Sequence, residues 1–469
     1  MSFSVDQSAP GADELIFLPL GGTGEIGMNM NLYGHDGRWL MIDCGITFPR
    51  GGRSPGMEII LPDPAYIKAR RDRLAGLLVT HAHEDHVGGV PYLWNQLQCP
   101  VYATPFTMAV LRRKLADQGL LDRVPLHEVD LSSRFEIGPF ALELVNLTHS
   151  IPEPNAVIVR SRLGSVLHTG DWKLDPHPLV GKPYDGAKLS RLRHERMLAL
   201  VGDSTNALNP GHTPSEGGLE SSLSNLIGTL EQRVFVTCFA SNIARLRTLA
   251  RAAVANGRFP AVLGRSMARM ISAGRECGYL DDLPNLVPES DIGYLPRNEV
   301  FVMCTGSQGE PRAALARIAD QRHPLVTLQR GDAVVFSSRM IPGNEEPIQR
   351  LQQRLRRVGA QVIDDQQAFL HVSGHPSEDE LRQMYRWVQP QFAIPVHGEA
   401  AHLARHAEIA RDCGVETALE ARNGQVIRIA RNGLTVVGKA RAGRLGISDG
   451  RLVEMDPLIS PIPVGAALT

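Results

Sequence analysis

Six consecutive residues, His81 to His86, read His-Ala-His-Glu-Asp-His, and three imidazoles and the carboxylate of Asp85 make four candidate metal ligands. They follow the apolar run Leu77-Leu78-Val79 after one residue, Thr80. Imidazole and carboxylate groups together suit zinc and related divalent ions. The first two histidines are two positions apart and share a face of an extended segment, whereas the aspartate and the last histidine fall at an expected helix start. The run therefore predicts a metal-binding loop.

One loop supplies too few ligands for a catalytic zinc ion, which needs further ligands and an open position for water. Three candidates each follow an apolar, strand-like segment and precede a turn-like residue: His149, Asp171 and His397. Such positions suit ligands at the edge of a sheet. Taken alone, an isolated histidine is more often a core or surface residue than a metal ligand, so the residues by themselves leave the role of His149 and His397 open.

The elements that must position these side chains change character near residue 206. Before it we expect short strands and few helices, with strands at 15–18, 39–42, 142–147, 156–160 and 165–169. After it, helical leucine spacing at 219–230 and 243–253 alternates with apolar strands at 234–239, 300–303 and 333–336. This alternation predicts a parallel sheet covered by helices. Ser377 and Glu380 form a capping-box pattern for a further helix that stops at Pro390.

A glycine motif near the N-terminus imitates a dinucleotide fingerprint. Gly22 to Gly27 matches G-x-G-x-x-G after a strand, and Asp43 lies 21 residues beyond Gly22. The fingerprint requires a helix after the third glycine. Here 29–33, a Gly-His-Asp-Gly turn and 39–42 predict a β-hairpin instead. We therefore expect no NAD site, and place these glycines in a tight loop near the metal site.

Composition limits the class of protein. With 469 residues, two or three domains are expected. The 49 basic and 50 acidic residues give a net charge of −1, which argues against general nucleic-acid binding and leaves only a local positive groove. The six cysteines form no Cys-x-x-Cys pair and are expected to be reduced. No leader pattern and no membrane-length apolar run is present, so a cytoplasmic protein without membrane association is expected.

A series of motifs resembles ribonuclease J, of the β-CASP branch of the metallo-β-lactamase superfamily. The motifs run in order from about residue 15 to 400: LGGTGEIG (20–27), THAHEDHVGG (80–89), THSIP (148–152), GDWK (170–173), GDSTNA (202–207), FASNI (239–243), CTGSQGEP (304–311), IPGNE (341–345), HVSGH (371–375) and PVHGE (395–399). The first histidine motif specifies only the superfamily. The later motifs specify the narrower family.

The resemblance implies an α/β fold: a metallo-β-lactamase αββα sandwich with an inserted, parallel-sheet β-CASP domain. The expected parts are 1–205 and 371–440 for the sandwich, 206–370 for the insertion, and 441–469 as a short tail. The tail's last residues, 457–469, are expected to be poorly ordered. The family's further C-terminal domain is expected to be absent, which puts in doubt a homodimer or homotetramer formed through it.

The resemblance also implies roles for particular residues. It places His81, His83 and His149 on one zinc ion and Asp85, His86 and His397 on a second, with Asp171 bridging them. The expected catalytic residues are His375, Asp85 and Asp203. His375 would protonate the departing oxygen, and Asp203 would orient a ligand histidine. A pocket for a 5′ phosphate is expected from the glycine-rich turn at 305–309 and from Ser307, His371, Ser373 and His375.

The expected function is zinc-dependent hydrolysis of RNA to 5′-phosphate products in RNA processing and decay, by 5′-to-3′ exonuclease and endonuclease activity, with manganese as a possible supporting ion. Two alternatives stay open. One is a DNA 5′-exonuclease of the same superfamily, because sequence does not reveal a contact to a 2′-hydroxyl. The other is a non-catalytic RNA-binding subunit of a decay complex.

Overall fold

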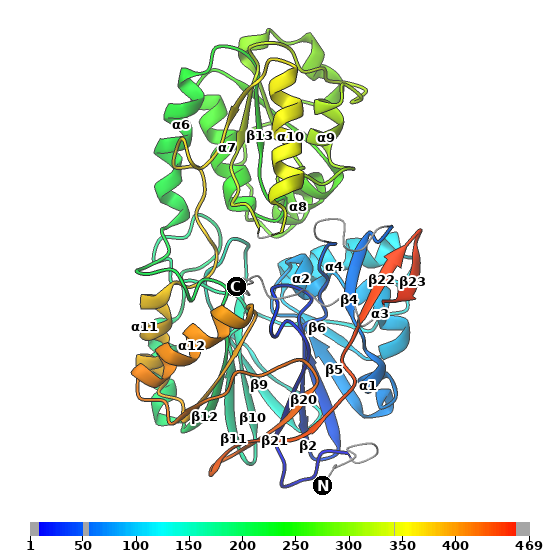
Figure 1. Cartoon of the computed structure of the whole chain (residues 1–469), viewed down its shortest axis with the longest axis vertical. Helices are drawn as coiled ribbons and strands as arrows, with labels where there is room; N and C mark the ends of the chain where they lie inside the picture. The colour runs from blue at the N-terminus through cyan, green and yellow to red at the C-terminus, as the bar shows by residue number, and fades with distance from the viewer. Residues whose placement is uncertain (1–8, 50–55, 342, 456–469) are drawn as a thin grey trace, which may run out of the picture.

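Two large β-sheets stacked face to face form the lower body in Figure 1, in a computed structural model that describes residues 9–49, 56–341 and 343–455. The first sheet has eight strands, in the order β21 (Gly433–Lys439), β20 (Gln425–Ala430), β1 (Ile16–Gly21), β2 (Met30–His35), β3 (Arg38–Ile42), β5 (Leu74–Leu78), β6 (Val101–Ala103) and β7 (Leu126–Glu128). The second has seven, in the order β19 (Thr417–Ala418), β18 (Phe392–Val396), β12 (Met197–Asp203), β11 (Gly164–His168), β10 (Asn155–Ser161), β9 (Phe140–Asn146) and β8 (Arg134–Ile137).

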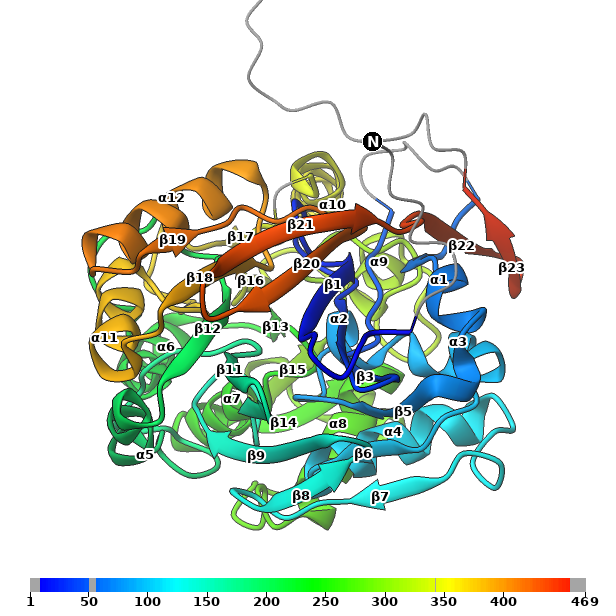
Figure 2. The same cartoon turned by 90° about the horizontal axis from the view of Figure 1, so that it is seen from below.

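Helices cover the outer face of each sheet, as Figure 2 shows from below. On the eight-stranded sheet lie α1 (Ala65–Lys68), α3 (Val90–Leu97) and α4 (Pro105–Asp117); on the seven-stranded sheet lie α5 (Gly186–Arg191), α11 (Glu378–Val388) and α12 (Ala400–Asp412). Between the sheets, alternate strand residues such as Phe17, Leu144 and Val201 form a third apolar cluster. The central strands of each sheet, such as β1 and β12, therefore bury both of their faces, and the predicted αββα sandwich is confirmed.

A separate parallel sheet forms the upper body in Figure 1. Its order is β14 (Phe259–Leu263), β15 (Val300–Cys304), β13 (Val234–Thr237), β16 (Ala333–Phe336) and β17 (Gln361–Ile363). Apolar clusters join one face to α6 (Leu219–Thr229), α7 (Ile243–Ala255) and α8 (Arg265–Glu276), and the other to α9 (Ala314–Ala319) and α10 (Glu345–Arg357). The strand-helix alternation expected after residue 206 is thus confirmed. The expected domain limits fall between β12 and α6 and between β17 and α11, and they stay a prediction.

Short elements complete the described chain. They are the helix α2 (Glu84–Val87), the 3₁₀ turns η1 (Arg71–Arg73), η2 (Leu192–His194), η3 (Glu216–Gly218), η4 (Glu289–Tyr294) and η5 (Arg297–Glu299), and a small sheet of β23 (Arg451–Glu454), β22 (Arg444–Ser448) and β4 (Ile59–Pro62). The start of the expected tail is thus a paired β-hairpin, while residues 457–469 lie outside the described residues. No helix of the described residues is both long and apolar enough to cross a membrane.

Helix α4 departs from the expectation of few helices before residue 206. Its side chains pack in two directions: Met108 and Leu111 join the cluster on the eight-stranded sheet, whereas Phe106 and Val110 join the cluster of the upper body. A helix that is buried on two sides shows no single apolar stripe, so the 3.6-residue pattern does not reveal it. The capping box at Ser377 and Glu380, by contrast, forms as predicted and opens α11.

The glycine motif forms a loop between two antiparallel strands. β1 pairs with β2, so no helix follows Gly27 and the dinucleotide reading is excluded as expected. Gly22, Gly24 and Gly27 all have positive φ, which glycine adopts without strain. The carbonyl of Gly22 accepts a hydrogen bond from the amide of His397 at 2.6 Å. The loop therefore lies against a predicted metal ligand.

A buried carboxylate on β9 gives a testable pH dependence. Glu143 is 2% exposed and pairs with Arg134 at 3.0 Å, with Arg160 at 2.6 Å and with Lys188. Burial alone would raise its pKa, but hydrogen bonds from Lys188, Arg134 and Arg160 outweigh this and lower the pKa of Glu143 to about 2. Because its pKa is about 4.3 in an unfolded chain, ionised Glu143 stabilises the fold above that pH.

Glu143→Gln is expected to lower the free energy of unfolding at pH 7 by about 1–2 kcal/mol. This is less than the pKa difference alone implies, because solvent around the cationic partners of Glu143 screens the ion pairs. The difference from the wild type should shrink as pH falls from about 4 toward 2, because the wild-type carboxylate then becomes protonated. Urea unfolding of both proteins at pH 7, 5 and 3.5 measures this. A difference that stays constant over that range would contradict the assignment.

Candidate metal centre

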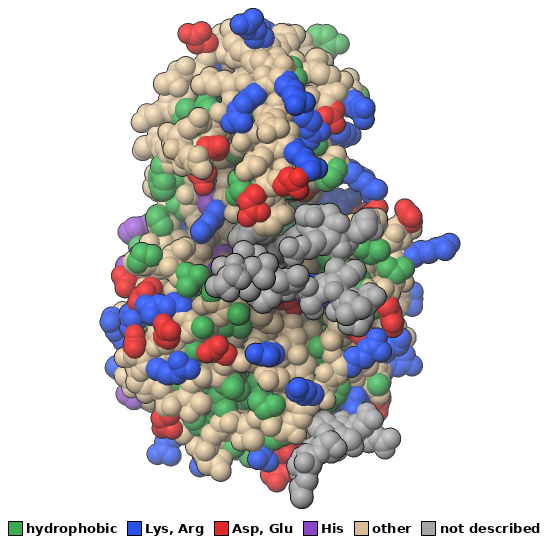
Figure 3. All heavy atoms as spheres, viewed as in Figure 1, with side chains coloured by type: hydrophobic (Ala, Val, Ile, Leu, Met, Phe, Trp, Pro, Cys, Tyr) green, Lys and Arg blue, Asp and Glu red, His purple; other side chains and the backbone are tan. Residues whose placement is uncertain are grey.

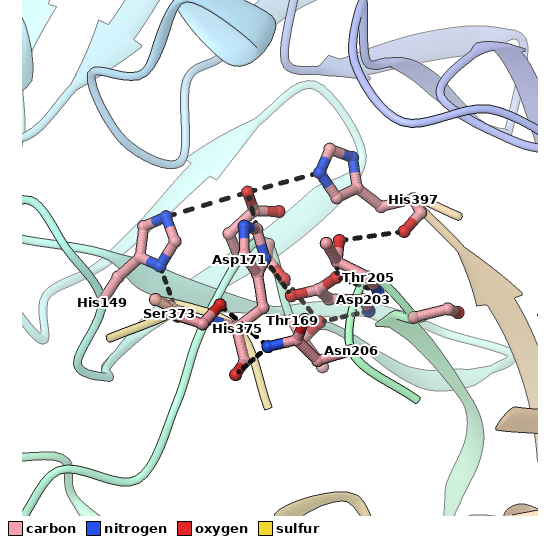
Figure 4. Close-up of polar contacts among 12 residues, drawn as sticks. His149, Thr169, Asp171, Asp203, Thr205, Asn206, Ser373, His375 and His397 are labelled. Atoms are coloured by element: carbon pink, nitrogen blue, oxygen red, sulfur yellow. Dashed lines mark hydrogen bonds and ion pairs between the residues drawn. The ribbon is translucent and has the colours of Figure 1, made fainter. Parts of the chain in front are cut away.

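Strand ends bring the predicted ligands to one edge of the sandwich. The strands β9, β11, β12 and β18 run in the same direction, since β11, β12 and β18 are parallel and β9 is related to β11 through the antiparallel β10. His149, Asp171 and His397 follow β9, β11 and β18, and the loop with His81 follows β5 of the other sheet. The candidate centre thus lies at this edge of the sandwich, and Figure 4 shows His149, Asp171 and His397 pointing toward one another.

The first group of candidate ligands is His81, His83, His149 and Asp171, whose ligand atoms all lie within 4.8 Å of one another. Nδ1 of His83 is 3.1 Å from Nε2 of His81 and 2.9 Å from Nε2 of His149. Oδ2 of Asp171 lies 3.8 Å from Nε2 of His81 and 3.9 Å from that of His149. Three imidazoles and a carboxylate are a donor set that fits zinc.

The second group is Asp85, His86, Asp171 and His397. Oδ2 of Asp171 lies 3.1 Å from Nε2 of His86 and 3.5 Å from Nε2 of His397, and Oδ2 of Asp85 lies 3.5 Å from the latter. Nε2 of His397 is buried and has no hydrogen-bond partner, which is costly unless a bound ion occupies its lone pair. Asp171 belongs to both groups, so its carboxylate is placed to bridge two ions.

Charges in the site favour bound cations. Burial lowers the pKa of His81 and of His149, and lowers that of His83 to about 4, which keeps these rings in the neutral form that binds metals. Burial also acts to lower the pKa of His86, but the nearby carboxylates, Asp171 foremost, outweigh it and raise that pKa. A positive charge beside His86 is therefore stabilised, and a divalent ion would supply it.

Asp43 and Thr80 orient two of the candidate ligands, His81 and His86, through hydrogen bonds to their Nδ1 atoms. Oδ2 of Asp43 accepts from Nδ1 of His86 at 2.7 Å and from the Thr80 hydroxyl at 3.0 Å, and Oδ1 accepts from the Thr80 amide at 2.8 Å. Since the Thr80 hydroxyl donates to Asp43, it accepts from Nδ1 of His81 at 3.0 Å. Both rings then present Nε2 to the centre.

Asn29 and the backbone of Gly374 orient two further candidate ligands, His397 and His149. Oδ1 of Asn29 accepts from Nδ1 of His397 at 2.9 Å, and the carbonyl of Gly374 accepts from Nδ1 of His149 at 2.5 Å. We did not predict Asn29, Asp43 or Thr80 as site residues. Asp43 appeared only within the misleading glycine motif, and the one signal for it was its position directly after an apolar strand.

His375 and Asp203 lie beside the second group. Nδ1 of His375 is 2.8 Å from Oδ2 of Asp203 and 3.8 Å from Oδ2 of Asp171 (Figure 4). Burial acts to lower the pKa of His375, but Asp203 and Asp171 outweigh it and raise that pKa to about 9. Oδ1 of Asp203 accepts from the Thr205 hydroxyl at 2.7 Å. The structure therefore differs from the expectation that Asp203 orients a ligand histidine, because the histidine that it contacts is His375.

The residues predicted for a phosphate pocket lie on two segments. Ser373 Oγ accepts from Nδ2 of Asn206 at 2.8 Å and from the amide of His375 at 3.2 Å. His371 has a buried Nδ1 without a hydrogen-bond partner. Ser307 is 2% exposed and lies in the loop after β15.

Hydrogen bonds connect the loop that carries Ser307 to the site. Gln308 Nε2 donates to the carbonyl of Arg339 at 2.9 Å, and Arg339 donates to Oδ1 of Asn206 at 3.4 Å. The structure thus brings His371, Ser373 and His375 together on one segment and connects Ser307 to them indirectly.

Comparisons with known proteins agree with this fold. Residues 24–227 match the metallo-beta-lactamase superfamily, residues 231–355 match "Ribonuclease J, beta-CASP domain", and residues 347–419 match "Zn-dependent metallo-hydrolase RNA specificity domain". A solved structure of a protein of unknown function from Enterococcus faecalis V583 shares the fold, with a TM-score of 0.59 and 14% identity over 88% of this chain and 100% of its own. The fold and the site together define a metal-dependent nuclease of the metallo-β-lactamase superfamily with a β-CASP domain.

Comparisons with individual relatives narrow this class of protein to one family. The chain is 46% identical to ribonuclease J of Sinorhizobium meliloti over 94% of this chain and 78% of that protein. It is 40% identical to ribonuclease J of Mycolicibacterium smegmatis, over 93% and 78%, and 37% identical to that of Thermus thermophilus, over 94% and 79%. The chain belongs to the ribonuclease J family.

Proposed function

We propose that this nuclease is a zinc-dependent ribonuclease that hydrolyses RNA to 5′-phosphate products, as a 5′-to-3′ exonuclease and an endonuclease in RNA processing and decay. The observation that carries the proposal is the pair of ligand groups that share Asp171, with His375 beside them and the β-CASP domain above. Two zinc ions, when bound, would polarise a phosphodiester and make water a stronger nucleophile. Manganese is the alternative ion, and its ligand preferences overlap those of zinc.

The residues of the chain divide the remaining work. The seven proposed ligands would hold the ions, and Asp85, whose side chain is 28% exposed, is the ligand carboxylate that faces solvent most. His375, whose side chain is 20% exposed, is placed to donate a proton to the departing 3′ oxygen. Asp203 would hold the His375 ring in the position for that donation.

A cavity next to the metal loop supports a nucleic-acid substrate. It has a volume of about 1010 Å³ and lies between α4, α8 and α9, with Glu84 of the metal loop in its wall. Its lining carries more basic than acidic side chains: the basic ones are Arg113, Lys114, Arg265, Arg269, Arg312 and Arg317, and the acidic ones are Glu84, Asp117, Glu289 and Glu310. Arg265 and Arg317 form no ion pair within the described chain, so they are available for phosphates. Phe48, which is 55% exposed in the wall, could stack on a base.

This positive cavity is a local feature. The chain as a whole carries a net charge of −1, and Figure 3 shows Lys and Arg side chains interspersed with Asp and Glu on the visible face. Substrate binding is therefore proposed to be limited to the cavity and the metal centre, with a modest dependence on salt.

The test compares one labelled oligonucleotide in three forms: RNA with a 5′ monophosphate, RNA with a 5′ triphosphate, and DNA. Each is incubated with purified protein and zinc or manganese. Stepwise release of nucleotides from the monophosphorylated RNA is the expected result. Preference for DNA would overturn the proposal in favour of a DNA 5′-exonuclease, and binding without cleavage would favour a non-catalytic subunit.

Ser307→Ala tests the proposed phosphate pocket. We expect it to lower exonucleolytic cleavage of the monophosphorylated RNA by about tenfold, since one hydrogen bond to a charged phosphate is lost. Cleavage of a circular RNA, which has no end to recognise, should change little. Equal losses on the two substrates would contradict a role for Ser307 in binding the 5′ end.

A further inference from the structure

Arg245, on α7 of the β-CASP domain, is fully buried and bonded at every nitrogen. Its Nε and Nη2 donate to the two carboxylate oxygens of Glu216 at 2.5 and 3.0 Å. Its Nη1 donates to the carbonyl and hydroxyl of Ser337 at 2.9 and 2.7 Å, and to the carbonyl of Leu370 at 2.9 Å. A buried guanidinium is tolerated only with such complete bonding.

Two of the three residues that bond to the Arg245 side chain lie on the two crossings of the chain between the domains, and the third, Ser337, follows β16. Glu216 is on the first crossing, between β12 and α6, and Leu370 is on the second, between β17 and α11. The amide of Glu216 donates to Oδ2 of Asp175 at 3.2 Å, and Asp175 pairs with Lys173 at 3.4 Å. The network therefore reaches into the sandwich, at the segment that follows Asp171.

The second crossing carries His371 at one end and His375 at the other, and the two ends are fixed differently. The carbonyl of His375 accepts from the Thr213 hydroxyl at 2.6 Å and from Asn206 at 3.1 Å, and its ring bonds to Asp203. At the other end, the hydrogen bonds to the carbonyl of Leu370 among the described residues come from Arg245 and from the Ser337 hydroxyl at 2.8 Å, and the carbonyl of Phe369 accepts from the Ser222 hydroxyl at 2.8 Å.

His371 lies close to the guanidinium of Arg245. Burial, and after it the charge of Arg245, lowers the pKa of His371 to about 3. A neutral imidazole with an unbonded, buried Nδ1 is thus held next to the point that Arg245 fixes. Among the described hydrogen bonds and ion pairs, none joins Arg245 to a candidate ligand of the metal centre.

We propose that Arg245 is a positioning residue that ties both crossings to α7 and so fixes the Leu370–His371 end of the second crossing, on which recognition of the RNA 5′ end depends. The role in recognition rests on the proposed function. Because His375 is held by separate contacts, Arg245 acts on binding of the 5′ end and leaves the cleavage step itself intact. Lysine cannot replace it, since a single ammonium group cannot reach Glu216, Ser337 and Leu370 together.

Arg245→Lys and Glu216→Gln are compared with the wild type on two substrates of the same sequence, a 5′-monophosphorylated linear RNA and a circular RNA. We expect kcat/KM on the linear RNA to fall about tenfold, mostly through a higher KM. A fall of this size corresponds to the loss of one charge-assisted hydrogen bond. Cleavage of the circular RNA should stay within about twofold. Hydrogen exchange of the full-length protein should increase in the peptide that covers residues 364–374 and stay unchanged around His375.

Arg258→Lys is the matched control. Arg258 is also buried in the β-CASP domain and donates to the carbonyls of Gln232 at 2.8 Å and of Leu230, and none of its hydrogen bonds among the described residues reaches a crossing. The Arg258→Lys variant should be less stable than the wild type, but the ratio of its cleavage rates on the linear and the circular RNA should be unchanged. Equal losses on both substrates in the Arg245 and Glu216 variants, or unchanged exchange in residues 364–374, would overturn the proposal. If the wild type cleaves neither RNA, the proposed function fails, and the exchange measurement still tests Arg245 as the fixing residue.

Discussion

Asp171→Asn is expected to lower nuclease activity by at least about 10³-fold, because the ions supply several kcal/mol of the stabilisation that the reaction needs. One carboxylate oxygen of Asp171 lies 3.1–3.9 Å from the Nε2 atoms of His81, His86, His149 and His397. An amide has the same shape but lacks the charge that two cations require. Both proposed ions should therefore bind more weakly in this variant.

The measurement is the number of metal ions per chain by elemental analysis after gel filtration, together with the cleavage rate and the thermal unfolding curve. Glu143→Gln is the control, since Glu143 is another buried carboxylate of the sandwich but lies outside the candidate ligand groups. It should retain both metals and its activity. If Asp171→Asn keeps two ions and activity within tenfold of the wild type, the bridging role is wrong.

His375→Gln is expected to lower kcat by about 10²–10⁴-fold, the range of general acid catalysis, while leaving the metal content unchanged. The reason is the position of the ring, which Asp203 holds at 2.8 Å and which lies outside the seven proposed ligands. Asp203→Asn should also lower kcat, because the His375 ring is then no longer held in position to donate its proton. Because both residues act through one proton donor, the double variant should lose far less than the product of the two single losses.

A substrate with sulfur in place of the departing 3′ oxygen separates proton donation from other roles. A thiolate leaves without protonation, so the difference in rate between the wild type and His375→Gln should shrink by about tenfold or more on this substrate. An unchanged difference would show that His375 does not protonate the departing group. A loss of bound metal in His375→Gln would place it among the ligands instead, as its membership of a third group with Asp171, Asp203 and His397 allows.

Local sequence patterns predicted some of the elements. The strand at Trp39–Ile42 and the helix opened by Ser377 and Glu380 depend on side chains within a few residues of one another, and both formed as expected. Helix α4 was missed because two separate cores bury it. Part of its apolar surface packs against the β-CASP domain, which lies more than a hundred residues further along the chain. The β-hairpin of β22 and β23 was missed because it is stabilised by pairing with β4, almost 400 residues earlier.

The sequence by itself determined the kind of chemistry: the run at His81–His86 specifies a metal loop through ligand types and spacing, and the ordered motifs specify the family. Only the tertiary structure decided what surrounds the ligands. Asn29 lies 368 positions from the histidine that it orients, and Arg245 joins Glu216 to Leu370 across two crossings. Contacts of this kind depend on which strand ends meet at one edge, and side chains at such separations leave no periodic pattern in the chain.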